Sequence, residues 1–151
     1  IAACYPEGHP ESKNIVADIE NLKRKADAGA SQLVTQLFLD NDYFYSFQER
    51  VALAGINLPI EAGIMPVTSK SQIERMVTMC GASIPASLSR IMQRYESNPE
   101  ALRDAGIAYA INQIIDLAAN GIDGVHIYTM NNPYVARKIT EGVESVVKHN
   151  R

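Results

Sequence analysis

The side chains best suited to chemistry are concentrated in the loop at residues 5–11, which reads Y-P-E-G-H-P-E. Its two prolines stiffen the backbone, so the loop presents its side chains at little entropic cost. Tyr5 and His9 could stack on a ring or hydrogen-bond to a ribose; alternatively, the loop is a rigid connection with solvated side chains. His9 and Glu11 are two candidate metal ligands, but a metal site needs three or four. We therefore predict no metal site.

A second group of polar residues follows at helical spacing. Asp18, Asn21 and Lys25 stand at positions i, i+3 and i+7, with Arg24 beside them. On a helix these residues share one face. A stripe so rich in donors can bind ribose hydroxyls and phosphates. The pattern alone favours a simpler interpretation, a solvated face on which these side chains pair with one another.

Two glutamines and a histidine complete the candidates. Gln36 falls inside the predicted strand Gln32–Leu39, where apolar neighbours require that its amide be satisfied. It faces either a ligand with paired donor and acceptor groups or polar groups of the sheet itself. Gln72 fits an ordinary exposed residue in the first turn of a helix. His126 is predicted to be a core histidine. No local motif for nucleophilic catalysis, a P-loop or a zinc protease is present.

These residues are set in a repeated βα pattern. Four β-like runs are each followed by a stretch of helical period, and Gly29, Gly55 and Gly81 end three of the helices at equal intervals. Asp40 is a predicted N-cap. Residues 82–99 are predicted to be irregular, and a last helix is expected near residues 133–147. The predicted strands are Ile1–Tyr5, Gln32–Leu39, Ile60–Met65 and Gly124–Thr129. The predicted inward faces are Ile15, Ile19, Leu22 and Ala26; Phe44, Phe47, Val51 and Ala54; Ile73, Met76, Val77 and Cys80; and Ala108, Ile111, Ile115 and Ala118.

Alternation of β and α predicts an α/β fold, a parallel sheet with helices outside it. An open, doubly wound sheet that binds a dinucleotide would need a glycine-rich turn after the first strand, and this turn has a single glycine, Gly8. A TIM (β/α)8 barrel fits better, because polar residues cluster just after strand ends. A whole barrel takes ~250 residues. Four βα units in a chain of 151 residues therefore predict half a barrel, a single partial domain over residues 1–151.

Composition excludes several function classes. A formal net charge of -3 leaves no basic surface for nucleic acid, and the apolar runs are too short to span a membrane. Cys4 and Cys80 lack metal-ligand spacing, which favours a reducing, cytoplasmic compartment. The chain begins at Ile1 within an apolar run, which we interpret as a cut inside a domain rather than a signal peptide.

Five sequence blocks resemble those of the methylenetetrahydrofolate reductase family. Residues 3–11 match the family pattern A-x-Y-P-E-x-H-P-E, and residues 21–30 match N-L-K-x-K-x-D-A-G-A. Residues 35–40 resemble T-Q-x-F-F-D, residues 63–67 match G-I-x-P-V, and residues 126–131 match H-F-Y-T-x-N. The blocks occur in the family's order and span nearly the whole chain, so together they are highly specific.

The resemblance implies the C-terminal half of the catalytic barrel, βα units 5 to 8. It implies a flavin-dependent enzyme that uses NADH or NADPH to reduce 5,10-methylenetetrahydrofolate to 5-methyltetrahydrofolate. By position, Gln36 would bind the pterin of the folate and Gln72 would lie along the folate site. Non-covalent FAD would be held by Tyr5, His9, Asp18, Asn21, Arg24 and Lys25. This implication reverses the simpler interpretation of the stripe.

The resemblance also marks what differs or is missing. Many bacterial members have an aromatic residue in place of Met76 and an arginine in place of Asn132. The family's catalytic acid, a glutamate, belongs to the N-terminal half, so no catalytic residue is expected here and the isolated chain should be inactive. Such a chain could pair with the N-terminal half or form a homo-oligomer. The alternatives are a non-catalytic half-barrel that binds flavin or another phosphate-bearing ligand and, less favoured, a flavin barrel such as proline dehydrogenase.

Overall fold

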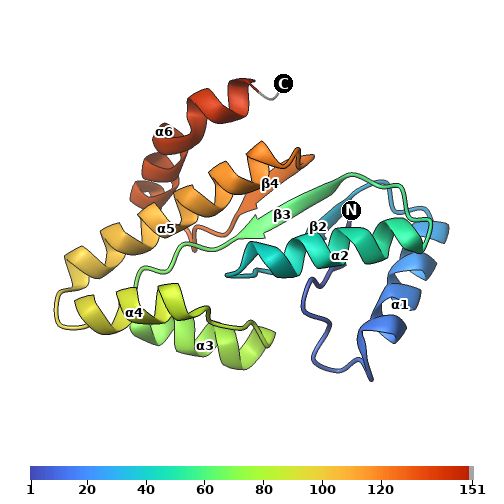
Figure 1. Cartoon of the computed structure of the whole chain (residues 1–151), viewed down its shortest axis with the longest axis horizontal. Helices are drawn as coiled ribbons and strands as arrows, with labels where there is room; N and C mark the ends of the chain where they lie inside the picture. The colour runs from blue at the N-terminus through green and yellow to red at the C-terminus, as the bar shows by residue number, and fades with distance from the viewer. Residues whose placement is uncertain (150–151) are drawn as a thin grey trace.

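The computed structural model describes residues 1–149, which fold around a parallel four-stranded sheet (Figure 1). The strands are β1 (Ala2–Cys4), β2 (Leu33–Thr35), β3 (Ile60–Ile64) and β4 (Gly124–Ile127), in the order β1-β2-β3-β4. Cys4 pairs with Thr35, and Glu61 pairs with Gly124. The predicted parallel α/β architecture is confirmed, and β1 and β4 are the two edges of this sheet.

The strands are shorter than the sequence pattern predicts. β2 ends at Thr35, so Gln36 lies just beyond the strand and not inside it. Its backbone N–H donates to the carbonyl of Cys4 at 2.7 Å, which keeps the two segments paired for one more residue. Apolar residues continue past the strand because Leu37, Phe38 and Leu39 are buried outside the sheet. An apolar run therefore measures burial rather than the length of a strand.

Helices alternate with the strands, and side chains cap several of them. Asp40 accepts from the N–H of Asp42, which confirms the predicted N-cap, and Asn14 accepts from Ala17. Gly81 ends a helix in the left-handed conformation, with φ of 68°. In residues 1–149 no helix is long and apolar enough to cross a bilayer. The helices are α1 (Ile15–Asp27), α2 (Asn41–Leu53), α3 (Lys70–Cys80), α4 (Ala86–Tyr95), α5 (Pro99–Ala119) and α6 (Pro133–His149).

Two expectations about the second half of the chain are wrong. The segment predicted to be irregular contains α4, whose Leu88 and Met92 are buried one turn apart. The predicted inward face of α5 is wrong at Ala108 and Ile115, which are exposed, whereas Ala118 is buried and Ile111 packs against the core. The buried residues of this helix are Leu102, Gly106, Ile107, Ala110, Gln113, Ile114, Leu117 and Ala118.

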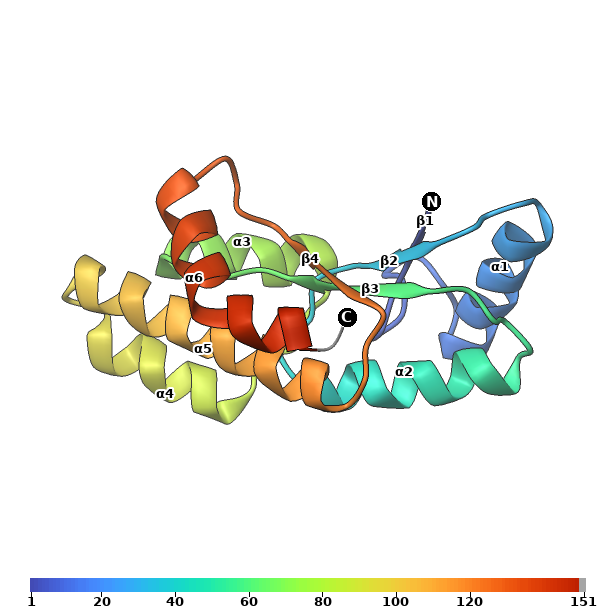
Figure 2. The same cartoon turned by 90° about the horizontal axis from the view of Figure 1, so that it is seen from above.

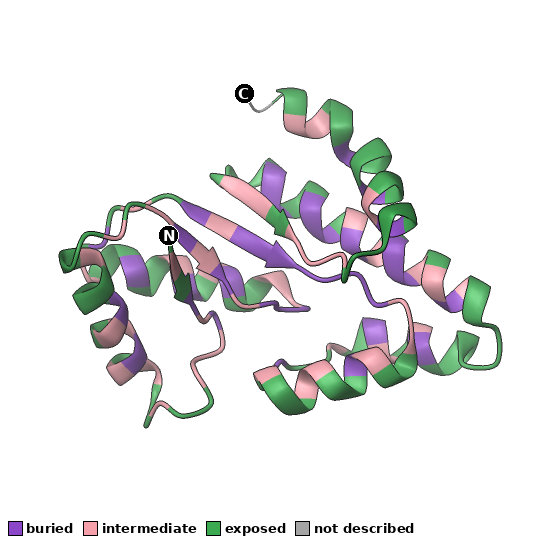
Figure 3. Cartoon of the chain, turned by 180° about the vertical axis from the view of Figure 1, so that it is seen from behind, coloured by how far each residue is buried: buried purple, intermediate pink, exposed green. Residues whose placement is uncertain are grey.

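Two apolar clusters position the loops that follow the strands. The larger cluster packs α1, α2, α5 and α6 against the sheet, with Leu33, Ile60 and Ile64 at its centre. The smaller one packs α3 and α4 against the segments that leave β2 and β3. Figure 2 shows α2, α4 and α5 on one side of the strands, and Figure 3 shows exposed and half-buried positions on the strands themselves. Glu61 on β3 is half-buried and His126 on β4 is exposed.

Candidate functional site

The loop after β1 folds back on itself before α1 begins. Gly8, with φ of 87°, closes a turn in which its N–H donates to the carbonyl of Tyr5 at 3.0 Å. The N–H of Ser12 donates to the carbonyl of His9 at 2.9 Å. These two turns bring the loop alongside α1, so residues from both elements can line a single space.

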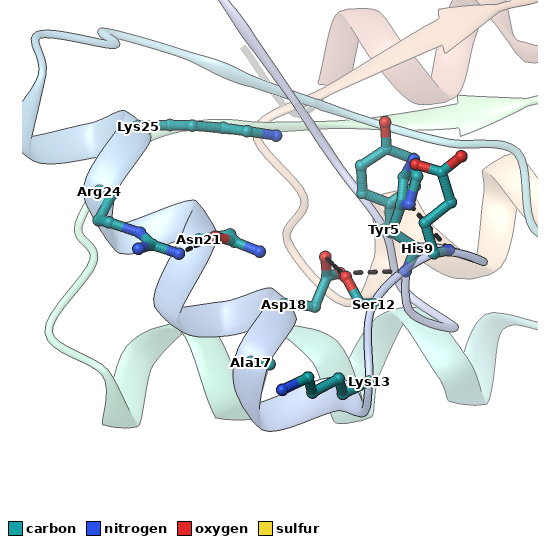
Figure 4. A pocket seen from close by; sticks show the side chains of 10 residues that line it. Tyr5, His9, Ser12, Lys13, Ala17, Asp18, Asn21, Arg24 and Lys25 are labelled. Atoms are coloured by element: carbon teal, nitrogen blue, oxygen red, sulfur yellow. Dashed lines mark hydrogen bonds between the residues drawn. The ribbon is translucent and has the colours of Figure 1, made fainter.

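A cavity of about 690 Å³ lies between this loop and α1 (Figure 4). The resemblance assigned residues in the loop and on the helix to the cofactor, and the structure brings all of them together. The cavity is lined by Tyr5, His9, Glu11, Ser12, Lys13, Ala17, Asp18, Asn21, Arg24 and Lys25. The predicted stripe is therefore the wall of a cavity and not a fully solvated face.

Asp18 organises the loop side of the cavity. It is buried, and its carboxylate accepts from the N–H of His9 at 3.3 Å and from Oγ of Ser12 at 3.0 Å. Both of its oxygens are thus engaged by the loop. A buried carboxylate satisfied in this way holds the shape of the loop.

The ring of His9 is oriented by its neighbours. It meets the ring of Tyr5 edge-on, with 4.6 Å between the ring centroids. Its Nδ1 accepts from the N–H of Glu11 at 3.1 Å, so the proton of the neutral ring is on Nε2. His9 therefore offers Nε2–H as a donor.

Cations lie at both ends of the cavity, with Lys13 before the first turn of α1 and Arg24 and Lys25 in its last turn. Lys25 donates to the carbonyl of Ala3 at 2.8 Å, and its Nζ lies 5.6 Å from the centre of the Tyr5 ring. Arg24 donates to Oδ1 of Asn21. Three cations against the carboxylates of Glu11 and the engaged Asp18 suit a ligand that carries phosphates.

Gln36 lies next to this cavity rather than in it. Its Oε1 accepts from the N–H of Leu37 at 2.9 Å, which leaves Nε2 as the group that can donate to a ligand. A narrow space of about 10 Å³ separates the loop from neighbouring chain segments and shares Tyr5 with the larger cavity. It is lined by Tyr5, Pro6, Glu7, Gly8, Gln36, Leu37, Cys80 and Ala82.

Gln72 is not brought to either space. It lies in the first turn of α3, half-buried, and its Oε1 accepts from the N–H and Oγ1 of Thr68 at 3.1 and 2.7 Å. Its position at the N-terminal end of α3 follows the exit of β3. The structure thus shows an amide that is held in one orientation by Thr68.

Sequence reasoning missed Ser12, Lys13 and Ala17 as lining residues. A signal for Ala17 was available, because it stands one helical turn before Asn21 and extends the stripe toward the start of the helix. Ser12 could not have been found in this way, because its role depends on the turn that brings it to Asp18.

Cys4 and His126 do not line the cavity. Burial raises the pKa of the Cys4 thiol to about 12, so this cysteine stays protonated at neutral pH. Among residues 1–149 no group of three potential metal ligands comes together. His126 is exposed, and its Nδ1 lies 3.8 Å from a carboxylate oxygen of Glu61. Its predicted place in the core is wrong.

Comparisons with known proteins agree on one family. The family model described as methylenetetrahydrofolate reductase matches residues 1–144. The 5,10-methylenetetrahydrofolate reductase of Escherichia coli (strain K12) is 36% identical over 129 residues, which cover 85% of this chain and 44% of that protein. Methylenetetrahydrofolate reductase (NADH) 1 of Arabidopsis thaliana is 38% identical over 138 residues, or 85% of this chain and 23% of that protein.

A solved structure shares the fold. It is an uncharacterized protein from Clostridium thermocellum that binds two copies of 5-methyl-5,6,7,8-tetrahydrofolic acid, with a TM-score of 0.69 at 15% identity, covering 97% of this chain and 53% of that one. This chain spans less than half the length of the two curated relatives. From the family match over residues 1–144, the chain belongs to the methylenetetrahydrofolate reductase family.

Proposed function

We propose that this chain is the C-terminal half of the catalytic barrel of a reductase, βα units 5 to 8. The whole enzyme reduces 5,10-methylenetetrahydrofolate to 5-methyltetrahydrofolate with NADH or NADPH and carries non-covalent FAD. The observation that carries this proposal is the joint lining of one cavity by Tyr5, His9, Asp18, Asn21, Arg24 and Lys25. A half-barrel accounts for the parallel sheet with two edges and for the span of less than half of the relatives.

The residues of the cavity fit a flavin dinucleotide by their chemistry. Arg24 and Lys25 supply charge-assisted donors for its phosphates, and His9 supplies Nε2–H. Tyr5 offers an aromatic face beside them, and Asn21 a carboxamide suited to ribose hydroxyls. Asp18 contributes by fixing the loop. FAD, when bound, supplies the hydride chemistry, whereas the protein supplies position and electrostatics.

Gln36 and Gln72 form part of the folate wall in this proposal. Gln36 presents Nε2 beside Tyr5, where a donor can orient the pterin toward the flavin. The folate ligand named for the Clostridium thermocellum protein supports a pterin as the substrate class. The general acid that activates the substrate is expected in the N-terminal half, so this half alone should lack turnover.

A visible absorbance spectrum of the full-length protein tests the proposal. We expect a yellow protein with bound FAD that bleaches anaerobically on addition of NADH or NADPH and recovers its colour on addition of methylenetetrahydrofolate. A colourless protein that takes up no added FAD would rule the proposal out.

The second candidate is a binding module without catalysis, which is favoured by the fact that residues 5–25 alone line the cavity. This candidate predicts FAD binding without recovery of the colour by folate. The two half-reactions in the same experiment therefore separate the candidates.

The cationic end of the cavity gives a sharper test. Replacing both Arg24 and Lys25 by alanine removes two charge-assisted contacts, each worth roughly 1.5–3 kcal/mol. We expect the double variant to lose FAD during gel filtration and to regain much of its rate in excess FAD. The matched control replaces Lys23 and Arg50, two exposed cations that do not line this cavity, and should retain FAD. Failure of excess FAD to restore the rate would refute the phosphate contacts.

A further inference from the structure

The loop that lines the cofactor cavity is held from two sides. On the side of α1, Asp18 accepts from His9 and Ser12. On the other side, the carboxylate of Glu7 accepts from the N–H of Ser83 with both oxygens, at 3.2 and 3.0 Å. Glu7 lies between Tyr5 and His9 in the sequence, so a loop that contributes Tyr5, His9 and Glu11 to the cavity is bonded to a segment 76 residues further along the chain.

The segment that Glu7 holds is the exit of α3. The helix ends at Cys80, Gly81 takes the left-handed conformation, and Ala82 is buried in the smaller apolar cluster. A Cβ built on Gly81 would lie 3.7 Å from Cγ of Pro10, so the loop passes close enough to this exit that a single added methyl group would contact it. The narrow space between them holds only about 10 Å³. Residues of the loop and of this exit, Tyr5, Pro6, Glu7, Gly8, Cys80 and Ala82, line this space together.

Because α3 is a single helix of 11 residues, fixing its C-terminal exit also fixes the direction of its N-terminal turn. That turn carries Gln72, whose amide is oriented by Thr68. The charge-assisted hydrogen bond of Glu7 thus lies at the C-terminal end of α3, and Gln72, a predicted substrate-binding residue, lies at its N-terminal end.

We propose that Glu7 is a positioning residue that aligns α3, and with it Gln72, against the cofactor loop. This inference rests on the proposed function, because it takes Gln72 as part of the folate wall. It assigns to a residue of the cofactor loop an effect on folate binding. A residue that only stabilised the fold would affect folate binding independently of Gln72.

A double-mutant cycle on the full-length protein, saturated with FAD, separates these roles. The measured quantity is the Kd for 5-methyltetrahydrofolate in wild type, Glu7→Ala, Gln72→Ala and the double variant. We expect each single variant to weaken binding about tenfold, and the double variant to be no more than about tenfold weaker than wild type, since one contact is lost in each case. Weakening by about a hundredfold in the double variant would show independent effects and overturn the proposal.

Two further variants keep the test decisive. Glu7→Gln retains one oxygen acceptor without the charge, and charge-assisted bonds are roughly twice as strong as neutral ones. It should give an intermediate Kd, and a Kd equal to that of wild type would overturn the proposal even if Glu7→Ala does not fold. Glu20→Ala removes an exposed carboxylate of α1 that does not line the cavity, and should leave the Kd unchanged. If wild type binds FAD but not the folate, the proposed function itself fails; if both bind and the cycle is additive, only the role of Glu7 fails.

Discussion

At the scale of single residues, Gln36 shows how a hydrogen bond inside the protein decides what a side chain can offer a ligand. Because Oε1 accepts from the N–H of Leu37, the ligand meets the Nε2 donor. A glutamate in its place would have no donor to offer. The substitution Gln36→Glu should therefore weaken the interaction with the ligand that accepts this hydrogen bond, which in our proposal is the pterin.

We expect Gln36→Glu in the full-length enzyme to slow reoxidation of the flavin by methylenetetrahydrofolate at least about tenfold, the equivalent of roughly 1.4 kcal/mol. Reduction by the nicotinamide should change much less. Stopped-flow absorbance measures both half-reactions. Gln48→Glu, the same chemical change on α2, serves as the control and should alter neither. Equal slowing of both half-reactions would argue against a role at the pterin.

At the scale of elements, α2 and α5 are joined by a small polar network. The carboxylate of Asp116 accepts from the hydroxyl of Tyr45 at 2.6 Å and from the amide of Asn41 at 2.7 Å. These two hydrogen bonds, with that of Tyr45 the larger effect, lower the pKa of Asp116 below its ordinary value. The network therefore favours the ionised carboxylate of the folded state.

We expect Tyr45→Phe to lower the free energy of unfolding by about 1 kcal/mol at pH 7, a small value because the pair is largely exposed. A carboxyl group with a lowered folded pKa contributes stability above its unfolded pKa and loses that contribution as the pH falls through the folded pKa. The difference between wild type and variant should therefore shrink below about pH 4. Urea unfolding at several pH values measures it. Tyr43→Phe, on the same helix and without this hydrogen bond, is the control.

The contact of α5 with the exit of β3 depends on a glycine. A Cβ at Gly106 would lie 1.6 Å from the carbonyl oxygen of Val67, a distance that only backbone movement could relieve. At Gly142 on α6, a Cβ would meet the end of the Ile111 side chain at 2.6 Å, and a side chain can turn away.

We expect Gly106→Ala to destabilise the protein by about 2 kcal/mol or more, despite the better helix propensity of alanine. Gly142→Ala should be close to neutral. The gain in helix propensity, about 1 kcal/mol, offsets the smaller cost of rotating the Ile111 side chain. Thermal unfolding of the two variants compares them directly. If Gly106→Ala cost as little stability as Gly142→Ala, α5 would have to be able to move away from β3.

These elements show what the sequence pattern could and could not predict. Caps such as Asp40 and the apolar faces of the first three helices are local signals, and the structure confirms them. The face of α5 was misjudged because this helix packs against α2, α4, α6 and the sheet, so apolar residues surround much of it. α4 was missed because Pro85 precedes it and no side chain caps it.

Some residues of the candidate site could be predicted from local sequence patterns, and others could not. Residues on the stripe of α1 follow from helical spacing, and the resemblance supplied the reason to take them as a binding surface. The bond between Glu7 and Ser83 has no such signal, because nothing in the spacing of two residues 76 positions apart indicates that they meet. Contacts of this kind depend on how whole elements pack.

At the scale of the whole molecule, the sheet exposes both of its edges. In residues 1–149, β1 and β4 each have a single neighbouring strand, and Ile1 beside β1 is 81% exposed. A cavity of about 630 Å³ runs along β4 between α5 and α6, with Ile114, Val125 and Val143 among its lining residues. Unpaired strand edges, with the exposed apolar side chain of Ile1 beside one of them, favour association with another chain.

We expect the chain of residues 1–151, expressed alone, to associate or aggregate and to show no reductase turnover. Coexpression with the N-terminal half should reduce the association by covering the edges of the sheet. Size-exclusion chromatography at several concentrations, with a reductase assay on each fraction, measures both. An active, monodisperse monomer would show that the catalytic acid is within this chain.

The cavity of about 690 Å³ is built from residues 5–25 alone, and this locality has a consequence for the order of folding. Contacts between residues near in sequence cost little loop-closure entropy, whereas the pairing of β3 with β4 must close a much longer loop. We therefore expect the cofactor cavity to mature before the sheet is complete, so that flavin can be captured during synthesis. Pulse-labelling hydrogen exchange during refolding would reveal this order as early protection of α1, and late protection of α1 relative to β4 would contradict it.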